Sequence, residues 1–161
     1  MTNLRTGFGF DTHRLGKGAN LWLGGIKIDS DLGAIGYSDS DVLIHAIIDA
    51  LMGAACLGDI GAHFPDNDPA YEGIDSKILL TNTVDLLKQN HFQIVNIDTT
   101  INLEKPKLRP HIDNMRTCLA GILGLDVQRV SIKATTGEKM GFVGQREGIA
   151  AYANVLLEQI G

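Results

Sequence analysis

The sequence predicts a single α/β domain, in which segments of strand character alternate with segments of helical periodicity. Short runs rich in β-branched and aromatic residues favour strands, and longer runs with apolar residues every three to four positions favour helices. The length of 161 residues suits one domain, over 1–161, better than two. Hydrophobic residues make up 44% of the chain and charged residues 20%, which argues against a disordered chain.

The first segments predict a strand and a hairpin. Leu4–Phe10 is rich in phenylalanine and predicts a strand that is interrupted by two glycines. Leu21–Leu23 and Ile26–Ile28 flank Gly24-Gly25, a glycine pair typical of a tight two-residue hairpin turn. The polar segment over 29–40, which also contains glycine, predicts a loop.

The next segment predicts a buried helix from near Ser40 to Gly58, because glycine commonly ends a helix. Almost every position in it is apolar, so we expect burial on all sides. Asp41, His45 and Asp49 are the exceptions, and their spacing places them on one stripe. Residues 28–76 contain no Lys or Arg, so we expect a cation or a network of donors to face this stripe. A hydrogen-bonded core histidine is the plainer alternative.

A loop over 58–73 separates this helix from a second one. The segment Asp75–Gln89 has an amphipathic pattern that predicts a helix. Phe92–Leu103 is rich in isoleucine, valine and threonine and predicts a strand.

The last third predicts one more helix and one or two more strands. Two prolines precede a helix over His111–Leu123, which Gly124 closes. Val130–Thr135 predicts a strand, and 137–148 is a glycine-rich loop. The apolar tail Ile149–Ile160 fits a buried strand or a helix, and periodicity alone leaves both open.

Composition excludes several classes of function. The net charge is −5 and no basic patch stands out, so nucleic acid and anionic membrane surfaces are poor partners. The longest apolar run, 42–57, carries His45 and Asp49, so we expect no membrane helix. Cys56 and Cys118 lack the spacing of a metal or disulfide motif, and no secretory signal is visible. A cytoplasmic protein is the expectation.

A candidate metal site follows from three residues. Asp11 and His13 come at the end of the first predicted strand, where residues two apart point to the same face. With His45 they make a set of one carboxylate and two imidazoles, which suits zinc or another divalent transition metal in a catalytic site with a fourth position open. Asp49, one turn from His45, could orient its ring. A pair of ordinary hydrogen bonds at a strand end is the alternative for Asp11 and His13.

The strand over Val130–Thr135 runs into a second candidate site at residues 133–139, with the sequence KATTGEK. Its hydroxyls and backbone amides could hold phosphate oxygens, and Glu138 suits Mg²⁺ or Mn²⁺ bound jointly with phosphates. It lacks the spacing of a P-loop, and a solvated turn is the alternative. Asp59, after the buried helix, offers a carboxylate to a sugar or base. His63, His91 and His111 receive no role.

Five segments together resemble the 2-C-methyl-D-erythritol 2,4-cyclodiphosphate synthase family. They are GFGFDTHRL, the glycine hairpin, SDSDVLIHAIIDALMGAACLGDIGAHFPDNDP, PKLRPHI and KATTGEKMGFVGQREGIA. They occur in the family's order over nearly the whole chain. The resemblance implies a lyase that converts 4-diphosphocytidyl-2-C-methyl-D-erythritol 2-phosphate to the 2,4-cyclodiphosphate with release of CMP, in the non-mevalonate route to isoprenoid precursors.

The resemblance also implies a fold and an assembly. The α/β protomer, of the α+β type, would have a mixed four-stranded sheet with a small hairpin, and its helices would pack on one face. Three protomers would form a homotrimer whose sheets line a central core, with active sites between neighbours. The tail from Ile149 would then be a strand.

Site residues carry over from the family position by position. The resemblance implies zinc on Asp11, His13 and His45, and a second divalent ion, Mg²⁺ or Mn²⁺, on Glu138. Thr136 would be catalytic beside these four. The implied substrate-binding residues are Tyr37, Ser38, Asp59, Gly61, Asp66, Pro106, Lys107, Ala134, Thr135, Thr136 and Phe142.

Two positions depart from the family's pattern. Tyr37 stands in the flap where histidine is common, and tyrosine donates one hydrogen bond but carries no positive charge at neutral pH. Gln145 stands where some members have arginine, with Arg146 next to it, in a loop associated with an isoprenoid-diphosphate pocket. The alternative functions are a zinc-dependent phosphoesterase and a non-enzymatic cytidine-nucleotide binding module.

Overall fold

The computed structural model describes residues 3–161; residues 1 and 2 of the predicted domain lie outside the described residues. A five-stranded sheet in the order β4-β1-β7-β5-β6 forms its scaffold, and only β5 and β6 pair in parallel. The strands of this sheet are β1 (Leu4–Gly16), β4 (Gly33–Ile35), β5 (Phe92–Asn102), β6 (Val130–Thr135) and β7 (Gly148–Gln159). A separate hairpin pairs β2 (Leu21–Leu23) with β3 (Ile26–Ile28).

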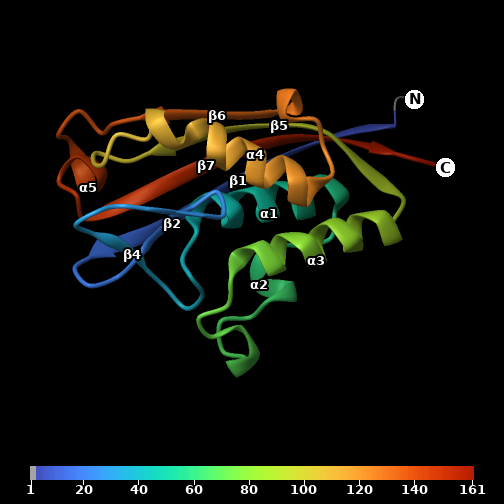
Figure 1. Cartoon of the computed structure of the whole chain (residues 1–161). Coiled ribbons are helices and arrows are strands. Elements are labelled where there is room, and N and C mark those ends of the chain that lie inside the picture. Colours follow the sequence, from blue (N-terminus) through green and yellow to red (C-terminus); the bar gives the residue numbers. More distant parts are fainter. Residues whose placement is uncertain (1–2) are drawn as a thin grey trace.

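Three long helices accompany the sheet: α1 (Val42–Ala55), α3 (Ser76–Gln89) and α4 (Ile112–Leu123). Figure 1 shows α1 beneath the sheet and α3 beneath α1, with the start of β1 and the end of β7 at the same end of the molecule. Two single-turn helices lie in the loops, α2 (Ile60–His63) and α5 (Gly141–Gly144), together with short 3₁₀ turns at Pro69–Tyr71, Arg109–His111 and Val127–Arg129. None of the helices among residues 3–161 has the length and apolarity to cross a bilayer.

The prediction of a four-stranded sheet is wrong, because the sheet has a fifth strand, β4. β4 lies in the segment predicted as a loop, and it pairs antiparallel with Arg14–Gly16 at the end of β1. Three residues carry no alternating pattern, so this strand exists only through its tertiary partner. For the same reason β1 runs six residues beyond Phe10, since β7 and β4 pair with its second half.

Most predicted elements are confirmed near their expected bounds. The hairpin turns at Gly24 and Gly25, which have positive φ angles of 58° and 79° as the tight turn requires. Gly124 takes the left-handed conformation and ends α4. The ambiguous tail is the strand β7, which pairs along its length with β1 and β5.

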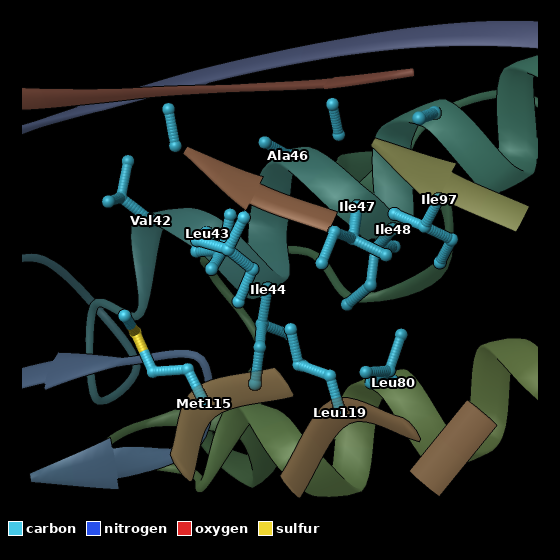
Figure 2. Close-up of a cluster of buried hydrophobic side chains, with 14 of the residues drawn as sticks. Val42, Leu43, Ile44, Ala46, Ile47, Ile48, Leu80, Ile97, Met115 and Leu119 are labelled. Atoms are coloured by element: carbon cyan, nitrogen blue, oxygen red, sulfur yellow. The ribbon is translucent and has the colours of Figure 1, made fainter. Parts of the chain in front are cut away.

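The helix α1 is the centre of the core. Figure 2 shows its aliphatic side chains against Ile97 of the sheet and against Leu80, Met115 and Leu119 of the other two helices. The helix ends earlier than predicted, because Cys56 adopts the left-handed cap conformation with φ 58°. Leu57 then donates its N–H to Met52 and packs against the core, so the chain leaves the helix before Gly58.

Two glycines let β1 lie almost on the backbone of α1. A Cβ built on Gly9 would lie 1.9 Å from the carbonyl oxygen of Ala46, and one on Gly7 would lie 1.9 Å from that of Ala50. A glycine in a strand interior commonly marks such an approach. This contact brings the odd-numbered face of β1 against the helix that carries His45.

The opposite face of β1 and β7 is open. Phe8, Phe10 and Tyr152 are 62%, 45% and 36% exposed, and the rings of Phe10 and Tyr152 lie 5.2 Å apart. Helices therefore cover one face of this part of the sheet, and aromatic side chains stand on the other.

Candidate metal centre and adjoining pockets

Three predicted ligands from two elements converge on one point. Asp11 and His13 lie on β1, and His45 lies on α1. Asp11 Oδ2 lies 3.0 Å from His13 Nε2 and 3.0 Å from His45 Nδ1. The two ring nitrogens lie 3.1 Å apart. Within residues 3–161 this is the one group of three or more His, Cys, Asp or Glu side chains close enough to share a metal ion.

The chemistry of these donors fits a cation. His13 Nδ1 lies 3.2 Å from the carbonyl oxygen of Ile35, which can only accept, so this nitrogen carries the proton and Nε2 presents its lone pair. Asp11 Oδ2 is likewise an acceptor. Ligands on a tetrahedral zinc with bonds of about 2.0–2.1 Å lie about 3.3 Å from one another, a few tenths of an ångström more than here. A zinc ion therefore fits with a small outward shift of the three side chains.

The site attracts positive charge. Burial alone would raise the pKa of Asp11, but hydrogen bonds and charge from His13 and His45 outweigh it and lower the pKa to about 2. Burial would lower the pKa of His13, but the Asp11 carboxylate outweighs it and raises that pKa. Asp11 is consequently ionised at neutral pH, as a metal ligand must be.

A network of donors faces the polar stripe of α1, as predicted. Asp41 is fully buried and accepts the N–H groups of Gly24, Gly25 and Ile44 at 2.7–3.0 Å. Burial raises the pKa of this carboxyl group, and the hydrogen bonds oppose the rise. The carboxylate therefore ties the hairpin to the start of α1.

The expectation that Asp49 orients His45 is wrong. The Asp49 carboxylate accepts the N–H of Ile60 at 2.8 Å and so holds the start of α2. The side chains that contact His45 Nε2 are Ser38, at 3.1 Å, and Ser76, at 2.9 Å. Spacing along one helix suggested Asp49, whereas the real partners come from other segments.

A cavity of about 480 Å³ opens beside the three ligands. His13 and His45 line it, together with four of the predicted substrate-binding residues and several of their neighbours. Its lining includes Tyr37, Ser38, Gly61, Phe64, Asp66 and Tyr71. Asp59 caps α2 at the edge of this region and accepts the N–H of Ala62 at 2.9 Å. The flap residue Tyr37 donates its hydroxyl proton to the carbonyl of Asp68.

A second cavity, of about 460 Å³, lies along β6, at one edge of the sheet. Five of the predicted substrate-binding residues line it: Pro106, Lys107, Ala134, Thr135 and Thr136. Glu138 itself has a positive φ angle of 51°, and its Oε1 accepts the hydroxyl proton of Thr136 at 3.1 Å.

One chain does not bring all the predicted site residues together. The linings of the two cavities have no residue in common, and Phe142 lines a third, smaller hollow with His13. β7 and β5 lie between β1 and β6, so three strand spacings of about 4.8 Å separate these two strands. The metal ligands and the substrate-binding residues of the second cavity therefore lie toward opposite edges of the sheet.

Comparisons with known proteins agree along the whole chain. The YgbB family matches residues 4–158. The chain is 55% identical over 157 residues to a 2-C-methyl-D-erythritol 2,4-cyclodiphosphate synthase of Bacteroides fragilis, covering 98% of this chain and 99% of the relative. Its fold is similar to the IspF protein of Plasmodium falciparum in complex with CDP, with a TM-score of 0.86, 30% identity, and 100% and 99% of the two chains covered.

A longer protein shares the fold as well. The bifunctional IspDF of Campylobacter jejuni matches with a TM-score of 0.95 and 39% identity over 99% of this chain. The match spans 43% of that longer chain.

Proposed function

The chain belongs to the YgbB family, and from that premise we propose how its residues carry out the family's reaction. The enzyme is a lyase that converts 4-diphosphocytidyl-2-C-methyl-D-erythritol 2-phosphate to 2-C-methyl-D-erythritol 2,4-cyclodiphosphate and CMP, in the non-mevalonate route to isoprenoids. The observation that carries the mechanism is the convergence of Asp11, His13 and His45 beside a cavity.

The reaction joins two phosphates of one substrate. An oxygen of the 2-phosphate attacks the β-phosphorus of the diphosphate, and the bond from that phosphorus to the CMP oxygen breaks. The nucleophile is already anionic at neutral pH, so the protein needs no strong base. The residues have to hold two mutually repelling groups in contact.

Two cations would offset this repulsion. Asp11, His13 and His45 would hold zinc, and Glu138 would hold Mg²⁺ or Mn²⁺ together with phosphate oxygens. These ions supply positive charge and polarise the phosphoryl oxygens. The hydroxyl of Thr136, 3.1 Å from Glu138, would orient the diphosphate.

The cavity beside the ligands would take the methylerythritol. Asp59 and Gly61 would hold its hydroxyl groups, and Asp66 lines the same cavity. Tyr37 and Ser38 form the flap above His45, and Tyr37 could release Asp68 to donate its proton to a phosphate.

The second cavity would take the cytidine. Pro106 and Lys107 line one side, and Ala134, Thr135 and Thr136 line the other. Lys107 and Lys133 would offset part of the phosphate charge, and Phe142 would close the site from the next protomer.

A homotrimer would unite the two cavities. The substrate links a cytidine to a methylerythritol, whereas one chain holds their candidate cavities at opposite edges of its sheet. The exposed Phe8, Phe10 and Tyr152 give the sheet an apolar face that further copies would cover, so that the sheets line a central core. We propose that each active site joins the metal centre of one protomer to the nucleotide cavity of its neighbour.

Replacing Phe8 by glutamate is expected to break this assembly, because the new charge would be buried at the interface. Sedimentation should show monomers, and CMP release should fall by at least about 100-fold, since a partner supplies half of the site. The control is Ile78→Glu, which removes a similarly exposed side chain from α3. A Phe8→Glu protein with the mass and activity of the wild type would contradict the proposal.

Replacing Glu138 by glutamine is expected to raise the Mg²⁺ or Mn²⁺ concentration for half-maximal activity by about tenfold or more, because the ligand loses its charge. Zinc content should stay unchanged. Glu158→Gln, at the far end of β7, serves as the control. An unchanged Mg²⁺ dependence would show that Glu138 holds no ion.

One assay tests the function as a whole. CMP release and phosphorus NMR should show one cyclic diphosphate formed per CMP. In water enriched in ¹⁸O the cyclisation incorporates no label, whereas the phosphoesterase considered above would label a phosphate product. A nucleotide-binding module would release no CMP. Labelled product or absent CMP would overturn the proposed mechanism.

We also propose that residues 1–161 form one domain and that it works in the cytoplasm. The three long helices and the hairpin share one hydrophobic core with the sheet. Cys56 and Cys118 are free thiols, as is usual in a reducing compartment.

A further inference from the structure

A buried side-chain pair lies directly behind the metal ligand His45. Ser76, the first residue of α3, is fully buried, and its Oγ lies 2.9 Å from His45 Nε2. The Ser76 hydroxyl donates to Asp39 Oδ1 at 2.5 Å, and the Ser76 N–H donates to Asp39 Oδ2 at 3.0 Å. His45 is thus linked through one hydroxyl to a carboxylate that is 6 residues before it in the chain.

The direction of these hydrogen bonds follows from their chemistry. A carboxylate only accepts, so the single hydroxyl proton of Ser76 points to Asp39. The Ser76 oxygen must then accept a proton from His45 Nε2. Neutral His45 therefore carries its proton on Nε2, and its Nδ1 presents a lone pair to the point shared with Asp11 and His13.

The Asp39 carboxylate, which accepts the Ser76 hydroxyl proton, is itself held in place by further hydrogen bonds. Asp39 Oδ1 also accepts the N–H of Asp41 at 3.2 Å, and the Asp39 N–H donates to the carbonyl of Ile74 at 3.0 Å. Three donors thus hold the anion in one orientation. His13, in contrast, has its tautomer set by a backbone carbonyl, that of Ile35.

We propose that Asp39 and Ser76 are positioning residues for the metal centre: together they select the tautomer of His45 that binds through Nδ1 and strengthen that nitrogen as a ligand. The inference rests on the proposed zinc site. Partners of this kind behind a metal-bound histidine typically change metal affinity by about 10–100-fold. Ser38 Oγ lies 3.1 Å from the same Nε2 but has no carboxylate partner among its described contacts.

The test measures the zinc affinity of the assembled enzyme by competition with a chromophoric chelator, without substrate. Ser76→Ala removes the hydroxyl but keeps the N–H bond to Asp39, and it should weaken zinc binding by about 10-fold or more. Thr83→Val is the matched control, since it removes another fully buried hydroxyl of α3 that bonds to Leu79. It should leave zinc affinity within about twofold of the wild type, a much smaller change than the one expected for Ser76→Ala.

A second variant and a spectroscopic readout separate positioning from general destabilisation. Asp39→Asn keeps the size of the side chain but removes the anion, and it should also weaken zinc binding. The double variant with Ser76→Ala should lose little more zinc affinity than either single variant, because both changes interrupt the same series of hydrogen bonds from Asp39 to His45. Nitrogen NMR of histidine-labelled, zinc-loaded wild type should show His45 bound through Nδ1 with a proton on Nε2.

Three results would overturn the proposal: zinc affinity of Ser76→Ala within about twofold of the wild type, where about 10-fold or more is expected; an equal loss in Thr83→Val; or Nε2 as the bound nitrogen of His45. If Ser76→Ala fails to fold, Asp39→Asn and the wild-type NMR spectrum still decide. Loss of zinc in His45→Ala but not in Ser76→Ala would leave the proposed metal site intact and refute only the role of the pair.

Discussion

His45→Ala is expected to lower the rate of CMP release by at least about 1,000-fold, because a Lewis acid contributes several kcal/mol of charge stabilisation in the transition state. His45 supplies one of three ligand atoms that lie within 3.1 Å of one another, and two remaining ligands would bind zinc weakly. The measurement is turnover in metal-controlled buffer, with zinc content determined on the same sample.

The fold should survive this change, since His45 contributes to a polar cluster at the edge of the core. Circular dichroism and sedimentation should match the wild type. His91→Asn serves as the control: His91 lies in the turn after α3 with φ 61°, a conformation that asparagine tolerates. A His45→Ala enzyme with wild-type turnover would refute the assignment of this ligand.

Gly9→Ala is expected to lower the free energy of unfolding by about 3 kcal/mol or more, because overpacking against backbone leaves little room to relax. The new Cβ would lie 1.9 Å from the carbonyl oxygen of Ala46 and 2.7 Å from the nitrogen of Ala50. β1 must move away from α1, which also separates Asp11 and His13 from His45. Zinc affinity should therefore fall together with the urea midpoint.

Gly53→Ala is the matched control for that experiment. Gly53 lies in α1, and a Cβ there would meet no atom within 4 Å. Alanine in a helix interior is favoured over glycine by about 0.5–1 kcal/mol, so this variant should be slightly more stable than the wild type. Equal urea midpoints for Gly9→Ala and the wild type would show that the close approach of β1 to α1 is not required.

The sequence predicts well those elements whose cause is local. The Gly24-Gly25 turn follows from the conformational freedom of glycine, and α3 follows from its amphipathic period. The candidate ligands Asp11 and His13 follow from strand alternation, and His45 stands out because the helix around it is apolar.

Elements with a tertiary cause escape this reasoning. β4 is a strand only because the end of β1 pairs with it, and Cys56 ends α1 because Leu57 turns back to the core. The contact of β1 with α1, on which the metal centre depends, is visible in the sequence only as two glycines in a strand.

The partners of His45 show the same limit. Helical spacing pointed to Asp49, but Ser76 contacts the ring from α3, and Asp39 is linked to the ring only through the Ser76 hydroxyl. Their signal in the sequence is weak, since serine and aspartate at the start of a helix usually have a capping role. Ser76 is distant in sequence from Asp39 and His45 and shares no periodic pattern with them, so the sequence alone does not indicate that these residues are in contact.

Anomalous diffraction at the zinc edge, on crystals of zinc-loaded enzyme, tests the central claim most directly. A single peak per chain should lie about 2.0–2.2 Å from Asp11 Oδ2, His13 Nε2 and His45 Nδ1, the usual lengths of such bonds. Crystals grown with zinc that show no peak there, or imidazole rings turned away from each other, would contradict the assignment of this site.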